Sequence, residues 1–347
     1  MKVGLFDHIG RADRPLATLF DERLAFYAEA DELGYYAMHI AEHHASPVNM
    51  APSPSLFLAA LARETKRMRL GPLCYLLTLY SPLRMIEEIS MLDHLSKGRF
   101  ECGVGRGVSP FELGYHNIDP EKSREIFIDA YNCIRKGMAS DVLDYEGPHY
   151  TYRKVPIELR PLQQPCPAFW YGSSNVTGST WAGEHGMHFA ANGPTDFAKG
   201  NIDAFRTALE KRGGAEHPKP EFAGGCAISA LRNIVVADTD AEAMRIARPA
   251  SRHHLDSLNH LRKLHGVDEH SARNNFPRAE SLEGQIAEGT FIVGAPDTVR
   301  AAILAQKEVL GLNYFMAYMI FGTMALGEAQ RSLRLFASEV MPSLARV

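Results

Sequence analysis

The stretch RLGPLCYLLTLYSPLRMIEEISMLDHLSKGRFECGVGRG, residues 69–107, decides the fold. The apolar run over 68–77 predicts a buried strand, and the amphipathic stretch 82–95 predicts a helix. Lys97-Gly98 is a typical helix stop, and 100–104 predicts the next strand. Strand, helix and strand in direct succession are typical of an α/β protein with a parallel sheet.

The same alternation continues on both sides of this stretch. Further strands are expected at 2–6, 36–41, 168–172, 188–191, 227–236 and 313–320. Further helices are expected at 16–32, 54–65, 120–139, 179–185, 195–212, 240–264, 295–309 and 326–341. Eight strands separated by helices favour a single (β/α)8 TIM barrel with insertions over a doubly wound open sheet.

No linker rich in Gly, Ser or Pro divides the chain, so we expect one domain over 1–347. The segment 141–164 is rich in Pro, Tyr and charge, and we expect an excursion with a small hairpin there. The weakly periodic segment 266–289 is expected to be a mobile loop that could act as a lid.

The composition is that of a globular protein. The chain has 347 residues, a formal net charge of -4, 46% hydrophobic residues and 22% charged residues. Its basic residues are scattered, so no nucleic-acid surface is predicted. The five cysteines are odd in number and form no CxxC pair, which indicates reduced thiols in a cytoplasmic protein. No stretch predicts a signal peptide or a membrane span.

The triplet Glu42-His43-His44 directly follows the second expected strand. The carboxyl ends of barrel strands form the active site, and a histidine can act as acid or base near neutral pH. Adjacent residues of an extended chain point in opposite directions, so the histidine pair does not predict a metal site. The alternative is that at least one of these histidines only caps or packs.

A glycine-rich segment, Gly103 to Gly107, runs out of the fourth expected strand. It departs from the dinucleotide fingerprint at Val108, where a glycine is required, and Pro110 obstructs the expected helix entry. A tight loop that approaches a ligand fits better, with Arg106 offering its guanidinium to a phosphate. The alternative is a surface arginine after a glycine-rich strand.

A second candidate anion site lies between the fifth expected strand and the helix after it. Small polar residues at a helix start can bind a phosphate through backbone N–H groups and the helix dipole. The candidate ligands are Ser173, Ser174, Asn175, Thr177 and Gly178. Simple helix capping is the alternative. Together with Arg106, this site could hold the phosphate of a mononucleotide such as FMN.

Several segments resemble one known family. They are KVGLF at 2–6, AEHH at 41–44, the stretch 69–107, WAGEHG at 181–186, VGAPDTV at 293–299 and LRLFASEVMPSL at 333–344. Their combination resembles the bacterial luciferase-like flavin-dependent monooxygenases, of the α-subunit type. The resemblance extends over nearly the whole chain.

The resemblance implies a two-component enzyme that binds reduced FMN supplied by a separate flavin reductase. Reduced flavin and O2 would form a C4a-(hydro)peroxyflavin that oxygenates a small apolar organic substrate. The family's catalytic histidine corresponds to His43, with Glu42 and His44 beside it as candidates. Its phosphate-binding arginine corresponds to Arg106. A homodimer or a higher homo-oligomer is also implied.

Two further positions follow from the resemblance. The family's non-proline cis peptide near the flavin corresponds to Leu73–Cys74. Its reactive cysteine corresponds to Gly105, which would remove a thiol, enlarge the space above the flavin ring and argue against light emission. Side chains at or near the ends of expected strands could line the pocket, with core packing as the favoured alternative for each. They are Phe6, His8, Tyr75, Phe111, Tyr115 and Trp170.

Three other functions compete with this hypothesis. A hydride-transfer enzyme that uses the deazaflavin F420 shares the barrel. A non-catalytic partner subunit of a luciferase-like heterodimer would also share it, although the presence of His43 and Arg106 argues against that role. A nicotinamide dehydrogenase on an open sheet is weakened by the incomplete glycine fingerprint.

Overall fold

The computed structural model describes residues 1–267 and 279–345, and parallel strands form a barrel in this part of the chain. The strands are β1 (Lys2–Asp7), β2 (Ala37–Ile40), β3 (Arg69–Pro72), β4 (Tyr75–Leu76), β5 (Cys102–Gly105), β8 (Phe169–Ser173), β9 (His188–Ala191), β10 (Ile228–Val236), β11 (Phe291–Gly294) and β12 (Tyr314–Tyr318). The barrel order is β3-β2-β1-β12-β10-β9-β8-β5-β4. A bridge between Leu70 and Phe100 joins β3 to the start of β5, so β3 and β4 share one of eight barrel positions. The predicted (β/α)8 barrel is confirmed.

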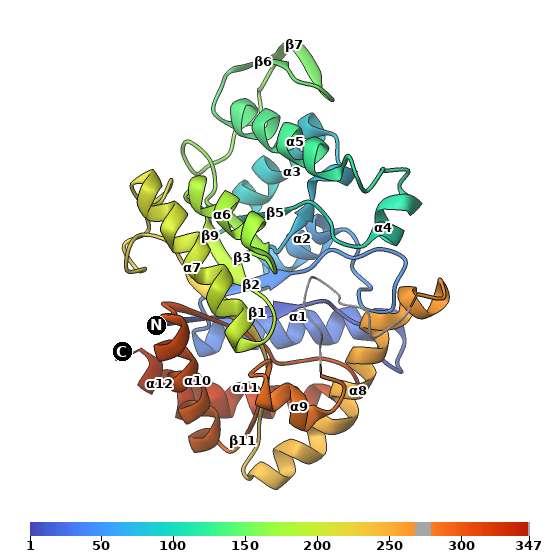
Figure 1. Ribbon diagram of the computed structural model, residues 1–347, viewed down its shortest axis with the longest axis vertical. Helices are drawn as coiled ribbons and strands as arrows, with labels where there is room; N and C mark the ends of the chain where they lie inside the picture. Colours follow the sequence, from blue (N-terminus) through green and yellow to red (C-terminus); the bar gives the residue numbers. More distant parts are fainter. Residues whose placement is uncertain (268–278, 346–347) are drawn as a thin grey trace.

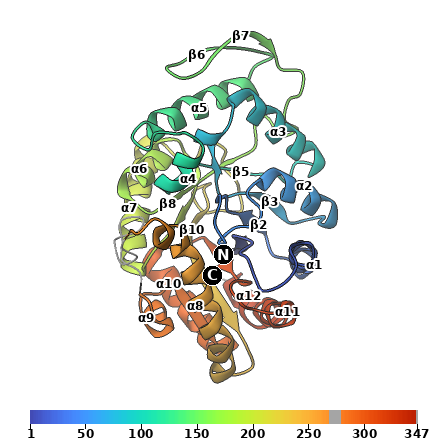
Figure 2. The same cartoon turned by 90° about the vertical axis from the view of Figure 1, so that its right-hand side faces the viewer.

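Helices surround the strands (Figure 2). They are α1 (Leu16–Leu33), α2 (Pro54–Glu64), α3 (Pro82–Leu95), α5 (Ser123–Met138), α6 (Val176–Glu184), α7 (Thr195–Arg212), α8 (Asp240–Leu264), α10 (Pro296–Leu310) and α11 (Leu326–Leu335). Shorter helices are α4 (Pro110–Tyr115), α9 (Leu282–Ala287) and α12 (Met341–Leu344). The Met1 amino group donates to the Leu344 carbonyl at 2.7 Å, which holds the two ends of the chain together (Figure 1). No helix in the described residues combines the length and the apolar character that a membrane crossing requires.

The structure refines several predicted elements. The expected strand 68–77 is interrupted, since the Leu73–Cys74 peptide lies between β3 and β4; this bond is cis, as predicted. The expected helix 326–341 changes to a π-helical segment at Phe336–Val340. The predicted excursion holds the hairpin of β6 (Val142–Glu146) and β7 (Thr151–Pro156), which projects from the barrel (Figure 1).

The segment 266–289 is not the continuous loop that its weak periodicity predicted. The short helix α9 forms within it because Ser281 accepts a hydrogen bond from the Gly284 N–H at the helix start. Residues 268–278 of the expected lid lie outside the described residues.

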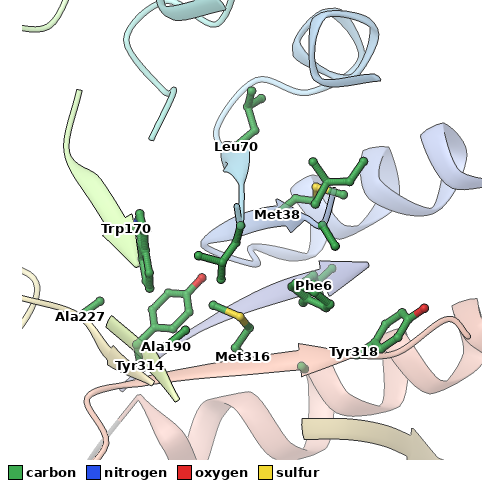
Figure 3. Close-up of a cluster of buried hydrophobic side chains, with 14 of the residues drawn as sticks. Phe6, Met38, Leu70, Trp170, Ala190, Ala227, Tyr314, Met316 and Tyr318 are labelled. Carbon is green, nitrogen blue, oxygen red and sulfur yellow. The ribbon is translucent and has the colours of Figure 1, made fainter. Parts of the chain in front are cut away.

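Large side chains fill the barrel interior in layers. Trp170 and Tyr314 pack together with a ring-centroid distance of 5.2 Å, and Met316 lies next along β12 (Figure 3). Phe6 and Tyr318 lie further toward the carboxyl ends of β1 and β12 (Figure 3). Gly4 makes room for this packing, because a Cβ there would overlap the Tyr314 hydroxyl.

A buried charged network closes the amino-terminal end of the barrel. The carboxylate of Glu101, which precedes β5, accepts hydrogen bonds from Lys219 Nζ at 2.8 Å and from Arg69 and Trp170. Burial alone raises the pKa of Glu101, but the charges of Arg69 and Lys219 outweigh it and hold that pKa well below its usual range. This end of the barrel is therefore fixed by ionic contacts, and the functional cavity lies at the opposite end.

Candidate active site

A cavity of about 230 Å³ lies at the carboxyl ends of the barrel strands. The loops after β2, β5, β8 and β9 contribute to its wall, as do side chains of β1, β10 and β12. This is the end at which barrel enzymes place their active sites. Glu42 and His43 from the triplet and Arg106 from the glycine-rich segment all line this one cavity.

His43 is held in the cavity wall by Glu112, a residue that the sequence did not single out. The His43 Nδ1 lies 3.1 Å from Glu112 Oε1, and the other oxygen, Oε2, accepts the backbone N–H of His44 at 3.0 Å. Burial raises the pKa of Glu112, but its hydrogen bonds and the histidine charges outweigh that effect and lower the pKa overall. An ionised carboxylate can only accept, so the hydrogen on His43 is on Nδ1 and faces Glu112. Nε2 is therefore the ring nitrogen left for chemistry.

The sequence contained a local signal for Glu112. Ser109 accepts the Glu112 N–H at 3.3 Å as the N-cap of α4, and Pro110 takes the first helical position. Serine, proline and then glutamate two residues on is a helix-start signature. The expectation that Pro110 obstructs a helix is therefore wrong, because proline is well suited to the first turn.

His44 takes a supporting position. Its Nε2 lies 2.9 Å from Glu42 Oε1, while Glu42 Oε2 accepts the Leu76 N–H at 3.0 Å. The His44 ring packs edge-on against His116 with a centroid distance of 4.6 Å. His43 lines the cavity and His44 does not, as expected for neighbours on an extended chain.

Arg106 lies in the loop after β5, where the backbone turns sharply. Gly107 has a φ of 84°, a conformation that favours glycine. The Arg106 carbonyl accepts the Thr78 hydroxyl at 3.0 Å, and its Nη1 donates to Ser123 Oγ at 3.2 Å. The guanidinium lines the cavity with most of its five N–H groups available for an anion.

Only some residues of the second candidate anion site line the cavity. Ser173, Ser174 and Asn175 line the cavity. Asn175 is also the N-cap of α6, since its Oδ1 accepts the Gly178 N–H at 2.8 Å. Thr177 is exposed and Gly178 is buried beneath Ser173, and neither lines the cavity. The amino end of α6 thus adjoins the cavity, and both the capping and the anion-site interpretations of this segment are compatible with it.

The Cys74 side chain lies directly beside Gly105. A Cβ at Gly105 would lie 3.0 Å from Cys74 Cβ and 3.3 Å from its Sγ. A thiol therefore remains beside position 105, supplied by the Leu73–Cys74 segment. The enlarged space above the flavin ring stays a prediction. Burial raises the pKa of Cys74 to about 12, so this thiol stays protonated at neutral pH.

Two of the six aromatic and histidine side chains expected near the pocket, Phe6 and His8, line it. Tyr75 and Trp170 are fully buried, where Tyr75 bonds Ser55 and Trp170 bonds Glu101. Phe111 stacks on His265 with a centroid distance of 4.4 Å, and Tyr115 donates to His265 or accepts from it at 2.6 Å. These four residues do not line the cavity, which agrees with the packing alternative given for each of them.

A model of the luciferase-like monooxygenases matches residues 1–313. The chain belongs to the luciferase-like monooxygenase family. The resemblance seen in the sequence is thereby confirmed, and with it the class of a flavin-dependent monooxygenase.

Curated relatives and a solved structure agree with this family. A Sinorhizobium fredii protein, y4wF, is 36% identical, and the match covers 98% of this chain and 96% of that protein. The oxygenase component of the flavin-dependent trigonelline monooxygenase of Acinetobacter baylyi is 29% identical over 70% of this chain and 67% of its own. The oxygenating constituent of 3,6-diketocamphane monooxygenase from Pseudomonas putida, solved with FMN, has a TM-score of 0.79, 22% identity and coverage of 99% and 98%. That structural likeness shows the shared barrel.

Proposed function

We propose that this chain is the oxygenase component of a two-component monooxygenase that uses reduced FMN and O2 to oxygenate a small organic substrate. The single observation that carries the proposal is that His43, fixed by Glu112, shares one cavity with Arg106 and the α6 amino end. This arrangement supports an acid-base role for His43 and a phosphate site at Arg106 and the α6 amino end, on one cavity at the carboxyl end of the barrel. The oxygenase-component and FMN-bound relatives support the same assignment.

The residues of the cavity fit FMN. Arg106 and the start of α6 offer a cation and backbone N–H groups for the phosphate. Gly105 and Gly172 lie against Cys74 without side chains of their own, and together with Leu73 they leave a flat apolar wall suited to a ring system. Reduced FMN, when bound, supplies the electrons that activate O2.

The protein contributes proton handling and positioning. The Nδ1–H of His43 donates a hydrogen bond to Glu112. The other ring nitrogen, Nε2, is then the atom that holds or transfers a proton in the cavity. Glu42 ties His44 to the backbone of Leu76, which fixes the loop that carries His43. We assign His43 as the acid-base residue, Glu112 and Glu42 as positioning residues, and Ser173, Ser174 and Asn175 as phosphate-side contacts.

Partners and location form part of the proposal. A separate flavin reductase would deliver the reduced cofactor, and we expect a homodimer or higher homo-oligomer. The five cysteines are unpaired in the described structure, which supports a reducing, cytoplasmic location.

Anaerobic titration with reduced FMN, followed by an oxygen pulse in a stopped-flow spectrophotometer, tests the function. We expect reduced FMN to bind and its oxidation by O2 to follow a course different from that of free flavin. Arg106→Ala should weaken binding, and His43→Ala should bind but alter the oxygen-dependent phase. Arg63→Ala, an exposed arginine on α2, is the matched control.

Other results of these experiments would support a different function for the protein. Binding of reduced F420 without binding of reduced FMN would establish hydride transfer instead. Binding of neither cofactor would favour a non-catalytic partner subunit. An assembled enzyme that keeps full activity with His43→Ala would also favour the partner-subunit role.

A further inference from the structure

The cavity has two walls of different chemical character. The wall from β4, β5 and β8 carries Arg106 and the α6 amino end, which the proposed function assigns to FMN. We infer that the opposite wall, formed by β1, β10, β11, β12 and α8, binds an uncharged ring compound with an oxygen acceptor as the substrate. This inference rests on the proposed function, because it takes the first wall as the flavin side. The apolar members of the opposite wall, called the substrate wall below, are Phe6, Leu231, Leu258, Phe291, Met316 and Tyr318.

The two carboxylates of the cavity are already engaged. Glu112 is bound to His43 and to the His44 N–H, and Glu42 is bound to His44 and to the Leu76 N–H. Arg106 lies on the flavin side. Among residues 1–267 and 279–345, the substrate wall contains no Asp, Glu, Lys or Arg. The basic side chains on this wall are the histidines His8 and His254, which carry no permanent charge. An ionic substrate group would lose its hydration there without a permanent counter-charge, which disfavours a charged substrate.

Rings form a continuous part of the substrate wall next to His43. The His8 ring lies 5.5 Å from His43, 5.4 Å from Tyr318 and 4.8 Å from Phe6, measured between centroids. His254, on α8, lies 5.6 Å from His8 and 5.4 Å from Tyr318. Ring systems pack favourably against such edges and faces at these separations. A substrate held on these rings would lie beside the proposed acid-base side chain.

One neutral polar group on this wall has no internal partner. Asn233 lines the cavity from β10, and its Nδ2 is buried without a hydrogen-bond partner among the described residues. A buried N–H donor without a partner is costly, and a ligand oxygen can supply the missing acceptor. Burial and the nearby Asp7 charge raise the pKa of Tyr318 well above its usual range, so this side chain also adds no charge. A carbonyl, ether or hydroxyl oxygen can accept from Asn233 Nδ2 without bringing a charge to this wall.

Isothermal titration calorimetry of the full chain at pH 7.5 tests the substrate class with three probes. They are 2-acetylnaphthalene, 2-naphthoate and 2-decanone, which are a neutral ring ketone, its anionic analogue and a linear ketone. We expect the ring ketone to bind at least about tenfold more tightly than the other two, which is about 1.4 kcal/mol. It should bind equally well with reduced FMN present, since the two occupy different walls.

Substitutions locate the binding. Leu258→Glu and Met316→Glu should each weaken binding of the ring ketone by roughly tenfold or more while changing reduced FMN affinity by less than about twofold. Leu258 is half-buried on α8, so its variant is expected to fold even if Met316→Glu does not. Leu264→Glu, at a 65% exposed position of the same helix, is the matched control and should leave both ligands unaffected. Asn233→Leu should abolish the preference for 2-acetylnaphthalene over 2-ethylnaphthalene.

Several results would overturn the inference. If 2-naphthoate binds more tightly than 2-acetylnaphthalene, the substrate wall binds anions. If 2-decanone binds as tightly as 2-acetylnaphthalene, the substrate need not contain a ring. Competition between the ring ketone and reduced FMN would mean that the ketone binds on the flavin side and not on the substrate wall. If reduced FMN binds normally and no probe binds, the substrate class is wrong while the proposed function stands. If reduced FMN itself does not bind, it is the proposed function that fails.

Discussion

Glu112 contacts two consecutive residues at once: its Oε1 lies 3.1 Å from His43 Nδ1, and its Oε2 accepts the His44 backbone N–H at 3.0 Å. One carboxylate on α4 therefore sets both the ring orientation of His43 and the path of the chain after β2. The same residue determines which His43 nitrogen carries the hydrogen. Because α4 belongs to the loop after β5, Glu112 joins the loop that carries Arg106 to His43 after β2.

Loss of the Glu112 acceptor should impair turnover more than cofactor binding. For Glu112→Ala we expect kcat to fall by about 10²-fold, near the lower end of what positioned acid-base groups contribute, while reduced FMN affinity changes by less than about twofold. Glu112→Gln keeps a hydrogen-bond acceptor but loses the charge, so its kcat should lie between that of Glu112→Ala and that of the unmodified protein. The measurement is steady-state turnover beside anaerobic FMN titration, with exposed Glu121→Gln as the control. Equal losses in binding and turnover would contradict a positioning role.

Arg106 should recognise the phosphate rather than the flavin ring. For Arg106→Ala we expect affinity for reduced FMN to fall by about 10- to 100-fold, because a charged hydrogen bond contributes about 1.5–3 kcal/mol. Affinity for reduced riboflavin, which lacks the phosphate, should not change. Anaerobic fluorescence titration of both flavins makes the comparison, and an equal loss for both would remove Arg106 from the phosphate site.

A buried ion pair at the end of β1 should be essential for stability. Asp7 is fully buried and accepts Arg23 Nε at 2.8 Å, the Tyr27 hydroxyl at 3.0 Å and the Ile9 N–H at 2.7 Å. Asp7→Ala leaves the Arg23 charge buried without its partner, so we expect a loss of about 3–5 kcal/mol in the free energy of unfolding. Urea unfolding measures this loss.

Two comparisons make the Asp7 prediction specific. Asp21→Ala, at an exposed position of α1, should change the free energy of unfolding very little. The double variant Asp7→Leu with Arg23→Met should be more stable than Asp7→Ala, because neither charge is left buried. A double variant as unstable as Asp7→Ala would mean that packing, not charge, sets the cost.

Two buried histidines should make stability depend on pH. Burial lowers the pKa of His39 and of His188 to about 4 from the ordinary 6.5, although the Glu101 charge opposes it. In the folded protein both rings stay neutral down to about pH 4, whereas in the unfolded chain they gain protons below about 6.5. The unfolded state then binds more protons, so stability is fully present above pH 6.5 and falls as the pH drops toward 4. Each histidine adds a slope of up to about 1.4 kcal/mol per pH unit.

Removal of one of these histidines should lower the difference in bound protons between the unfolded and folded states by up to one, and the slope should fall in proportion. We expect His39→Gln and His188→Gln each to flatten the fall in unfolding free energy between pH 6.5 and 4, as measured by urea unfolding at several pH values. His94→Gln, at an exposed position, is the control and should retain the full slope. An unchanged slope in both buried variants would show that other groups account for the acid sensitivity.

The sequence predicted the barrel well because long amphipathic helices and buried strands leave a clear periodicity. The predicted bounds of the helices 82–95, 195–212 and 240–264 agree with the structure. The short elements β11, α4 and α9 were missed, since four to six residues show little periodicity and depend on contacts elsewhere. The cis bond at Leu73–Cys74 was predicted from the family resemblance, and not from the residue pattern. The division of the strand into β3 and β4 at this bond was not predicted.

The candidate site was predictable where a motif lies at a strand end. The cavity includes Glu42, His43, Arg106 and Ser173, all of which follow from local patterns. The substrate wall was not predictable beyond Phe6 and His8, because His254, Asn233 and Met316 come from distant segments with no motif of their own. The position of Cys74 beside Gly105 was missed for the same reason, since only the folded chain brings the two residues together.

The division of the cavity between two sets of strands has a consequence for directed evolution. Because the proposed flavin contacts lie on β4, β5 and β8, libraries confined to Leu231, Met316 and Leu258 on β10, β12 and α8 alter a different part of the scaffold. Selectivity for new compounds could then be explored while the cofactor site is inherited intact. In such libraries the cofactor contacts would stay constant while the substrate contacts vary.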